Sequence, residues 1–261
     1  MSGDALISPM AQVHPDARIA DDVEIGPFTV IGPHVTIGAG STIGSHVVID
    51  GHTILGRDNQ VYRFVSLGAE PQHRGYKGEP TELVIGNRNT FREYCSVHRG
   101  TMLDQGITRI GDDNLLMAYT HVAHDCVLGN GITMANGASL AGHVTIGDHC
   151  ILAGFALVYQ FRRVGKLAFL AYCSGVVQDV PAFVRSAGSP AEPHGLNSIG
   201  MRRNGYSNDE IAAAKKAYRT LYRSKLRLSE AREEIRVQAE SSDAVKTILE
   251  SLDNAQRGII R

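Results

Sequence analysis

EIGPFTVIGPHVTIG, residues 24–38, is the stretch that decides the fold. An isoleucine recurs at every sixth position, at Ile25, Ile31 and Ile37, and each is followed by glycine. An amphipathic helix would need apolar residues at positions i, i+3, i+4 and i+7, which this spacing does not supply. A period of six with a compact residue after the apolar one instead indicates short strands joined by tight turns.

The same period extends over most of the chain. An apolar residue recurs at six-residue intervals over residues 13–67, 85–97 and 110–176, and a small or β-branched residue such as Thr29 lies four positions after it. The pattern resembles the left-handed parallel β-helix of the hexapeptide-repeat transferases. Three hexads close one triangular coil there, so residues 18 apart stack about 4.8 Å above each other. We therefore expect an all-β left-handed parallel β-helix.

Two stretches interrupt the period. Residues 70–82 (EPQHRGYKGEPTE) and 100–109 (GTMLDQGITR) carry glycine, charge and, in the first, proline where hexads should continue, so we expect both to leave the coil as loops, where binding residues are common. After Pro181 the hexads stop, and Ser207 and Glu210 form a capping box before an alanine-rich helix. The predicted domains are a β-helix over 1–190 and a C-terminal α-helical domain over 191–261.

Composition excludes several classes of protein. The chain is 43% hydrophobic and 20% charged, as in a soluble folded protein, and its net charge of −1 gives no global field for nucleic acid. No apolar run approaches the ~20 residues that cross a bilayer, and residues 1–10 lack a secretory signal, so we expect no membrane span and a cytoplasmic location. The cysteines show no CxxC spacing, which predicts reduced core residues and no zinc ribbon. They are Cys95, Cys126, Cys150 and Cys173.

One segment of the C-terminal region is strongly basic. Residues 201–227 hold eight basic side chains against two acidic ones, and four of the basic residues fall on the predicted alanine-rich helix. These four are Lys215, Lys216, Arg219 and Arg223. The sequence leaves two interpretations open, a solvated helix face and a docking surface for an acidic partner.

Histidines gather around the segment AYTHVAHDC, residues 118–126. His121 and His124 lie within one coil, Gly142 and Gln160 lie 18 and 36 residues beyond His124 on the same edge, and His143 is displaced by one residue. A neutral imidazole can accept a hydroxyl proton near pH 7, which suits acyl transfer. Three histidines can also hold zinc, and histidines can simply cover a surface. The spacing leaves these three interpretations open.

Longer motifs carry a family resemblance. They are GDDNLLMAYTHVAHDC (111–126), GHVTIGD (142–148), YQFRRVG (159–165), CSGVVQDVP (173–181) and QRGIIR (256–261). With these motifs essentially the whole chain resembles the UDP-N-acetylglucosamine acyltransferases of lipid A biosynthesis. The resemblance implies transfer of an (R)-3-hydroxyacyl chain from acyl carrier protein to the 3-hydroxyl of UDP-N-acetylglucosamine, the first step of that pathway. It implies no metal or redox cofactor, because acyl carrier protein brings phosphopantetheine.

The resemblance also implies residue roles. His124 would be the general base, Asp125 would orient it if the turn bends there, and the Gly142 N–H would bind the oxyanion. The residues implied in substrate binding are His121, His143, Gln160, Gln72, Asn197 and Arg203. Asn197 and Arg203 match positions that contact the nucleotide and phosphopantetheine in that family. The positions that depart from the common pattern are His73, Gly75, Tyr159, Ile199 and Asn204. Because a single prism has flat walls, we expect a homotrimer with clefts between neighbours.

Tyr172 stands where long-chain members of that family carry glycine, one coil above Gly154. If the ring plugs the acyl groove, we expect a donor shorter than about fourteen carbons, near ten to twelve; if it only covers the wall, it sets no length. Two other functions compete with lipid A acyl transfer. They are an acetyl-CoA-dependent hexapeptide acetyltransferase and a β-helix zinc carbonic anhydrase, and the long helical tail favours the acyltransferase over the zinc enzyme.

Overall fold

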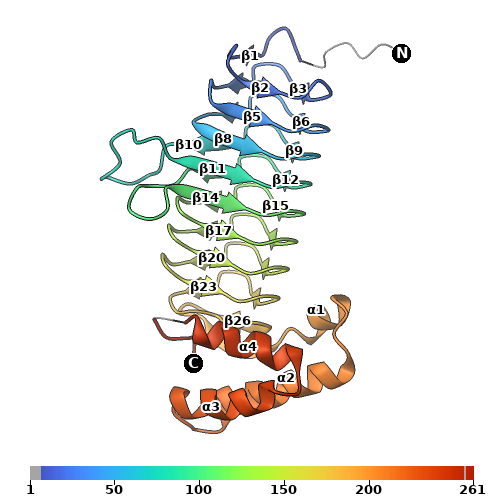
Figure 1. The fold of residues 1–261 in the computed structure, drawn as a ribbon, viewed down its shortest axis with the longest axis vertical. Coiled ribbons are helices and arrows are strands. Elements are labelled where there is room, and N and C mark those ends of the chain that lie inside the picture. Colours follow the sequence, from blue (N-terminus) through green and yellow to red (C-terminus); the bar gives the residue numbers. More distant parts are fainter. Residues whose placement is uncertain (1–6, 256) are drawn as a thin grey trace.

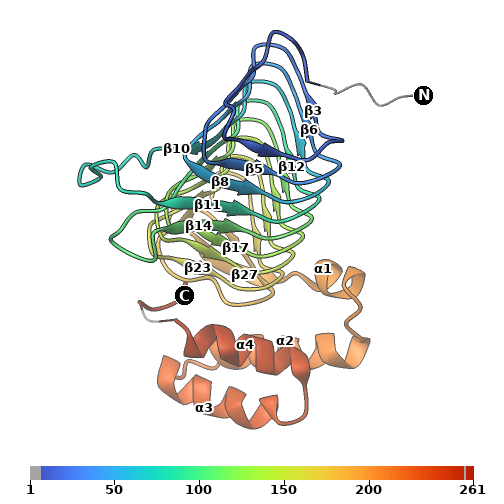
Figure 2. The same cartoon turned by 45° about the horizontal axis from the view of Figure 1, so that its top comes forward.

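The computed structural model describes residues 7–255 and 257–261. Over these residues the chain winds into a left-handed parallel β-helix with a triangular outline, and α-helices follow at its C-terminal end (Figures 1 and 2). The predicted fold class is confirmed. Two segments of the sequence discussed above include residues outside the described range. These residues are 1–6, within the segment 1–10 that lacks a secretory signal, and Gln256, the first residue of the motif QRGIIR.

In the described part of the chain, successive strands contribute in turn to three sheets. The β1 sheet contains β1 (Gln12–Val13), β4 (Val30–Ile31), β7 (Val48–Ile49), β10 (Ser66–Ala69), β13 (Ser96–His98), β16 (His121–Val122), β19 (Ser139–Leu140), β22 (Leu157–Val158) and β25 (Gly175–Val176). The β2 sheet contains β2 (Arg18–Ile19), β5 (Val35–Ile37), β8 (His52–Leu55), β11 (Glu82–Ile85), β14 (Ile107–Ile110), β17 (Val127–Leu128), β20 (Thr145–Ile146) and β23 (Arg163–Val164). The β3 sheet contains β3 (Glu24–Ile25), β6 (Thr42–Ile43), β9 (Gln60–Val61), β12 (Thr90–Phe91), β15 (Leu115–Leu116), β18 (Thr133–Met134), β21 (Ile151–Leu152), β24 (Phe169–Leu170), β26 (Val184–Ala187) and β27 (Glu192–Leu196).

The period of six sets the register of the sheets. Val30 pairs with Val48 and Ile31 with Ile49, so partners lie 18 residues apart as predicted. The recurring apolar residues point into the prism, where Ile25 is 2% and Ile49 0% exposed. Each such side chain contributes about 1.5–3 kcal/mol by burial, which explains why the register is held along the whole stack.

The two interruptions do leave the coil, but both end earlier than the sequence suggests. Glu82 already belongs to β11, and Ile107, Thr108 and Arg109 belong to β14, which pairs with β11. The prediction of a loop through residue 109 was wrong because Thr108 is fully buried in the column of small inward residues. The loops are therefore residues 70–81 and 99–106, and both project from the edge between the β1 and β2 sheets (Figure 1).

The turns between the β3 and β1 sheets hold large residues, against the expectation of compact ones. Phe28, Phe64 and Tyr119 have φ of 61°, 62° and 63°. Their rings belong to a column in which successive centroids lie 4.9–5.2 Å apart, completed by His46 and Tyr94. Stacking between coils offsets the strain that a left-handed turn imposes on a bulky residue.

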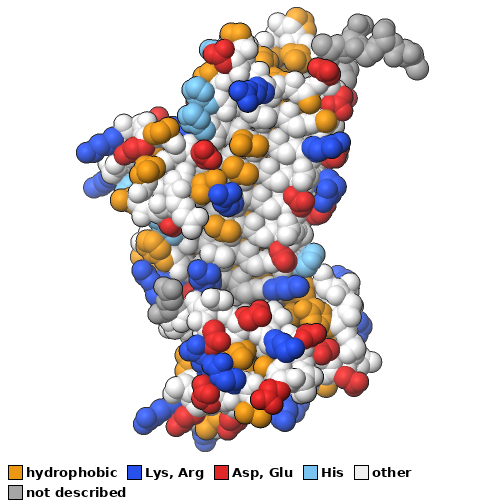
Figure 3. Space-filling view, viewed as in Figure 1, with side chains coloured by type: hydrophobic (Ala, Val, Ile, Leu, Met, Phe, Trp, Pro, Cys, Tyr) orange, Lys and Arg blue, Asp and Glu red, His pale blue; other side chains and the backbone are white. Residues whose placement is uncertain are grey.

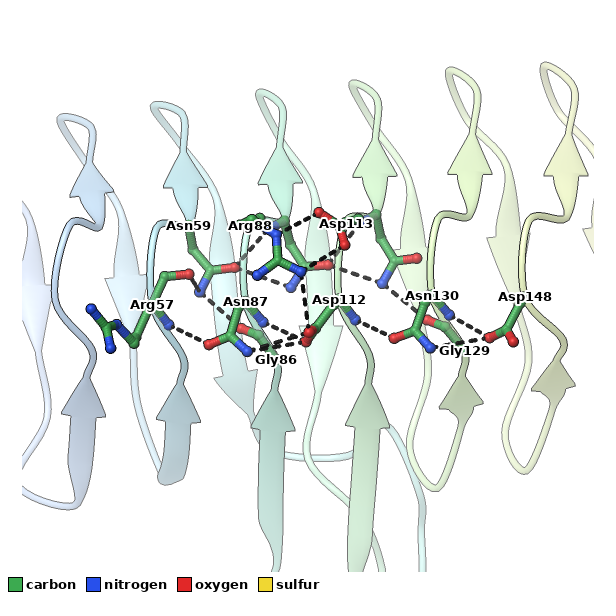
Figure 4. Close-up of polar contacts among 12 residues, drawn as sticks. Arg57, Asn59, Gly86, Asn87, Arg88, Asp112, Asp113, Gly129, Asn130 and Asp148 are labelled. Carbon is green, nitrogen blue, oxygen red and sulfur yellow. Dashed lines mark hydrogen bonds and ion pairs between the residues drawn. The ribbon is translucent and has the colours of Figure 1, made fainter. Parts of the chain in front are cut away.

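Asparagine and aspartate form ladders at the edge between the β2 and β3 sheets, which the hexad pattern does not reveal. Inside the prism the Asn89 N–H and side-chain amide both donate to Asn59 Oδ1, at 2.9 and 3.0 Å, and Asn114 repeats the arrangement on Asn89. Outside, Asp112 Oδ1 accepts the N–H of Asn87 at 2.8 Å (Figure 4). The ladders satisfy the polar backbone of turns that could not otherwise be buried.

Three of the four cysteines lie in the core as predicted, at positions 95, 126 and 150. Burial raises the pKa of the Cys126 and Cys150 thiols to about 12, so both remain protonated. Cys173 is exposed, because its turn position points away from the prism, so the prediction of a core residue was wrong there. All four are free thiols.

The chain leaves the prism through the antiparallel pair β26 and β27, so strand structure continues to Leu196. The helices are α1 (Ser198–Arg203), α2 (Asn208–Arg223), α3 (Leu228–Ala239) and α4 (Asp243–Asp253). They share a second core with Leu167 and Phe183 of the last coils. On the face in Figure 3, acidic and basic side chains intermingle over the helices. Within the described residues, none of these helices has the length and apolarity to span a bilayer.

The capping box at α2 forms only in part. Ser207 Oγ accepts the N–H of Glu210 at 3.1 Å, as predicted. The Glu210 carboxylate does not return to Ser207; it accepts from Ser242 Oγ at 2.6 Å and from the Ala244 N–H at 2.8 Å. An acidic group at the N-terminus of α4 is favoured by the helix dipole, so Glu210 joins two helices.

Candidate active site

The edge between the β1 and β2 sheets brings two adjacent residues into direct contact. His124 Nδ1 lies 2.8 Å from Asp125 Oδ2. This contact requires a sharp bend, and Asp125 provides it with φ of 59°. Both side chains are buried, with 9% of His124 and 5% of Asp125 exposed. The turn therefore bends as the predicted orienting role of Asp125 requires.

The 99–106 loop holds the Asp125 carboxylate. The Thr101 N–H donates to Oδ1 at 2.8 Å and its hydroxyl donates to Oδ2 at 2.6 Å, while the Asp125 N–H donates to Thr108 Oγ1. Burial acts to raise the pKa of Asp125, but hydrogen bonds from His124 and Thr101 outweigh it and the pKa is lowered. An ionised Asp125 accepts a hydrogen bond from the Nδ1–H group of His124, which in the neutral ring leaves Nε2 as the acceptor.

Gly142 lies directly against the His124 ring on the next coil. A Cβ added at this residue would lie 2.5 Å from His124 Cε1 and 2.9 Å from Nε2, so only glycine leaves the ring in place. Among the described residues, no backbone or side-chain acceptor takes the Gly142 N–H, so this donor is available to a ligand. The 18-residue spacing predicted this proximity.

Further histidines surround the pair. His143 Nδ1 lies 3.0 Å from Asp104 Oδ2, and its ring centroid lies 5.1 Å from that of His124. Ser96 Oγ lies 2.8 Å from His121 Nδ1, and burial together with His124 lowers the pKa of His121. The group His124, Asp125 and His143 offers ligand atoms within 4.8 Å of one another, an arrangement that could also hold a metal ion.

His98 was missed in the sequence. It is 5% exposed and its ring centroid lies 4.9 Å from that of His121. Burial, with the nearby His121, His124 and Arg99, lowers its pKa to about 4, so the ring is neutral at pH 7. The signal that could have found it is the 25-residue register across the second loop, in which Ser96 pairs with His121.

A pocket of about 550 Å³ opens beside these residues, here named the His124 pocket. Its polar lining includes Gln72, His121, His124 and Ser139, with Gly142 beside them and Tyr159 on the next coil. Its apolar lining includes Leu140, Leu157, Val158, Val176 and Val177. A pocket with a basic group at one side and a long aliphatic wall suits an acyl chain whose reacting carbonyl lies at the histidine.

Comparison with known proteins identifies the family to which the chain belongs. Residues 16–51 and 107–142 match the bacterial transferase hexapeptide family, and residues 179–260 match the family described as UDP N-acetylglucosamine O-acyltransferase, domain 2. Acyl-[acyl-carrier-protein]–UDP-N-acetylglucosamine O-acyltransferases of Halorhodospira halophila and Burkholderia lata are 55% and 52% identical, each over 79% of this chain and 80% of theirs. The chain belongs to the UDP-N-acetylglucosamine O-acyltransferase family.

Solved structures of similar proteins support the same family assignment. LpxA from Acinetobacter baumannii matches with a TM-score of 0.96 and 43% identity, over 98% of this chain and 100% of that one. The O-acyltransferase from Moraxella catarrhalis matches with a TM-score of 0.96 and 44% identity, over 98% and 99%. The family resemblance drawn from the motifs is confirmed.

Other residues that the O-acyltransferase resemblance implies lie outside the His124 pocket. Gln160 is exposed one coil beyond Gly142, on the same edge, and Tyr172 is 78% exposed. Within the described residues, neither lines the pocket. The basic residues of α2 at positions 215, 216, 219 and 223 are all exposed.

Asn197 and Arg203 line a second pocket of about 520 Å³, here named the α1 pocket. The departing positions Ile199 and Asn204 line it too. The Asn197 side chain is engaged within the chain, since its Oδ1 accepts the Gly200 N–H at 3.0 Å and its Nδ2 donates to Leu167 O at 3.0 Å. Asn197 therefore caps α1, the short helix that carries Arg203.

Proposed function

We propose that this O-acyltransferase transfers an (R)-3-hydroxyacyl chain from acyl carrier protein to the 3-hydroxyl of UDP-N-acetylglucosamine, the first step of lipid A biosynthesis. The observation that carries the proposal is the His124–Asp125 pair, 2.8 Å apart, beside a pocket with an aliphatic wall. The names of the relatives supply the two substrates. The four free cysteines suit the reducing cytoplasm, which cell fractionation would check.

In the proposed mechanism His124 Nε2 takes the proton of the sugar 3-hydroxyl, and the oxygen attacks the thioester carbonyl carbon. The carbonyl electrons move to the oxygen, which the Gly142 N–H stabilises. When the intermediate collapses, the C–S bond breaks, and the phosphopantetheine sulfur leaves with the proton that His124 holds. Asp125 stays ionised throughout and fixes the imidazole. The reaction needs no metal or redox cofactor.

We also propose a homotrimer. The His124 pocket and the α1 pocket are separate in one chain, and a cleft between neighbouring prisms would join one copy's acyl-transfer groups to another copy's nucleotide contacts. Arg203 would supply a positive charge that binds the nucleotide. Asn197 would act indirectly, by capping the N-terminus of α1, which carries Arg203. Gln72, His121, His143 and Gln160 would contact the sugar side of the substrate.

Mass spectrometry of the reaction product tests the function. Purified protein, sized by light scattering, is incubated with UDP-N-acetylglucosamine and a panel of (R)-3-hydroxyacyl carrier proteins. We expect an O-acylated nucleotide sugar from a species of three chains. Product formed only with acetyl-CoA would favour an acetyltransferase. The ligand atoms of His124, Asp125 and His143 lie close enough together to hold a metal ion. Stoichiometric zinc in active protein would therefore overturn the base mechanism and favour the less expected zinc enzyme.

Tyr172 is proposed to set the acyl length. It is exposed in the turn before β25, whose residues Gly175 and Val176 line the His124 pocket. We therefore expect wild-type preference near ten to twelve carbons and a longer preferred chain in Tyr172→Gly. Each methylene that gains burial adds about 0.8 kcal/mol. Competition among donors of different length measures the shift. A wild-type preference for about fourteen carbons, or an unchanged profile in the variant, would return Tyr172 to a role as wall cover.

The exposed basic side chains of α2 are proposed to dock acyl carrier protein. Reversing charge at Lys215, Lys216, Arg219 and Arg223 should raise KM for the carrier and weaken its dependence on salt, because opposite charges steer association. Steady-state kinetics at two ionic strengths measures both effects. Charge reversal at Arg18 and Arg57 is the control, because both side chains are exposed on the prism, away from α2. Equal effects from both sets would leave the α2 residues as a solvated face.

A further inference from the structure

Arg99 is a buried cation at the base of the 70–81 loop. It directly follows β13, and only 9% of the residue is exposed. A buried guanidinium is retained only where its donors find partners. Arg99 lies outside the described lining of the His124 pocket, so direct contact with the pocket does not account for it.

The partners of Arg99 belong to β10 and to the 70–81 loop that follows it. Its Nη1 donates to Gly68 O at 2.8 Å, and its Nη2 lies 3.6 Å from the Glu70 carboxylate. Its Nε and Nη2 both donate to Tyr76 Oη, at 3.2 and 2.7 Å, and the guanidinium lies 5.4 Å from the centre of the Tyr76 ring. Tyr76 Oη in turn donates to Glu79 O at 2.8 Å, near the end of the loop.

Gly51 makes space for this group. A Cβ at Gly51 would lie 2.8 Å from Arg99 Nη1 and 2.9 Å from Gly68 O. Gly51 also has φ of 60°, so both the conformation and the space suit glycine. The guanidinium therefore fills the space between two coils, from which its planar fork reaches Gly68 of β10 on one side and Tyr76 of the loop on the other.

The loop that Arg99 holds reaches the candidate active site. Gln72 lines the His124 pocket, and the His73 ring centroid lies 5.5 Å from that of His124, edge to face. The His73 position is fixed within the loop, since its Nδ1 accepts the Gly75 N–H at 3.1 Å. A change in the loop's position would thus move two side chains at the site while leaving the prism unchanged.

We propose that Arg99 is a positioning residue that clasps the 70–81 loop over the His124 pocket through Tyr76, and so sets the affinity for the acceptor sugar nucleotide. The part that concerns the sugar nucleotide rests on the proposed function. Lysine can replace it only in part, because a single ammonium group cannot bind both Gly68 O on one side and Tyr76 Oη on the other with fixed geometry. Without the clasp the loop opens, and Gln72 is no longer preorganised.

Limited trypsin digestion tests the clasp independently of activity. The loop contains two exposed cleavage sites, Arg74 and Lys77. In Arg99→Met we expect cleavage at these two sites to be roughly tenfold faster than in wild type, with no change in cleavage elsewhere. Tm should fall by only a few degrees, because the Gly68 carbonyl loses its partner while the rest of the prism is unchanged. Arg92→Met is the matched control, because Arg92 also stacks on a tyrosine, 4.4 Å from the Tyr62 ring centre. Loop cleavage at the wild-type rate in Arg99→Met would overturn the proposal.

Kinetics tests the consequence for the site. We expect Arg99→Met to raise KM for UDP-N-acetylglucosamine roughly tenfold with kcat lowered less than about threefold, and Arg99→Lys to recover only part of the loss. Faster loop cleavage with an unchanged KM would refute the positioning role. If Arg99→Met does not fold, Tyr76→Phe removes the clasp hydroxyl and keeps the buried cation, and the same two outcomes decide. If the wild type does not use this nucleotide, the proposed function fails, while the digestion still decides whether Arg99 clasps the loop.

Discussion

Replacing His124 by alanine is expected to lower kcat by about 10²- to 10⁴-fold, the usual contribution of a general base. The fold should survive, because the side chain lies at an edge of the prism and the apolar core does not include it. Single-turnover kinetics with acyl carrier protein donor measures the chemical step. Added imidazole should restore part of the rate in His124→Ala, since a small base can enter the space that the ring leaves.

The control for this variant is His14→Ala, which removes an exposed histidine that directly follows β1, the strand at the N-terminal end of the prism (Figure 1). Near-normal turnover in His124→Ala with an unchanged Tm would contradict the assignment of the base. Loss of activity together with loss of the folded state would show instead that the His124–Asp125 contact is mainly structural.

Gly142→Ala should have an effect of similar size without altering any titratable group. The added methyl would overlap the His124 ring, with 2.5 Å between Cβ and Cε1, so the imidazole must turn away from Asp125. Misplacement of a reacting group by about 1 Å can lower the rate 10²-fold, and we expect kcat to fall by about that factor. Gly142 does not have positive φ, so the backbone accepts alanine.

Gly154→Ala is the matched control for stability, since a Cβ there would meet only Asn136 O, at 3.5 Å. Thermal unfolding of both variants separates the general effect of replacing glycine from displacement of the ring. An active Gly142→Ala enzyme would show that the ring has a second productive position and that the close approach of residue 142 is not required.

Much of the fold could be predicted because each hexad repeats the same pattern, with one apolar residue that must be buried every six positions. Ile25, Ile31 and Ile37 bury one apolar side chain per strand, and the 18-residue pairing follows from three strands per coil. The Asn59 and Asn89 ladder could not be predicted in this way, because an asparagine at a turn is equally suited to solvent until the coil above it is known. The rings of the Phe28 column were unexpected for the same reason.

In the candidate site, likewise, the residues in regular hexads could be predicted from spacing and those in the loops could not. The pairing of His124 with Gly142 follows from coil spacing, since both belong to regular hexads. Thr101 could not be found, because it lies in a loop whose path no period describes, yet it supplies two hydrogen bonds to Asp125. Gln160 was placed on the right edge, but spacing cannot tell a side chain that lines a pocket from one that is exposed.

The 70–81 loop has a consequence for how a repeat fold acquires new chemistry. Val48 pairs with Ser66 across 18 residues, and Ser66 pairs with Ser96 across 30. Because loop-closure entropy grows only with the logarithm of length, closing the longer segment costs about 0.5 kcal/mol more. The restriction is register, since a displacement by one residue would turn Leu83 from the core to solvent. A prism of this kind can therefore gain a binding loop at almost any edge with little loss of stability, provided that the chain re-enters in phase.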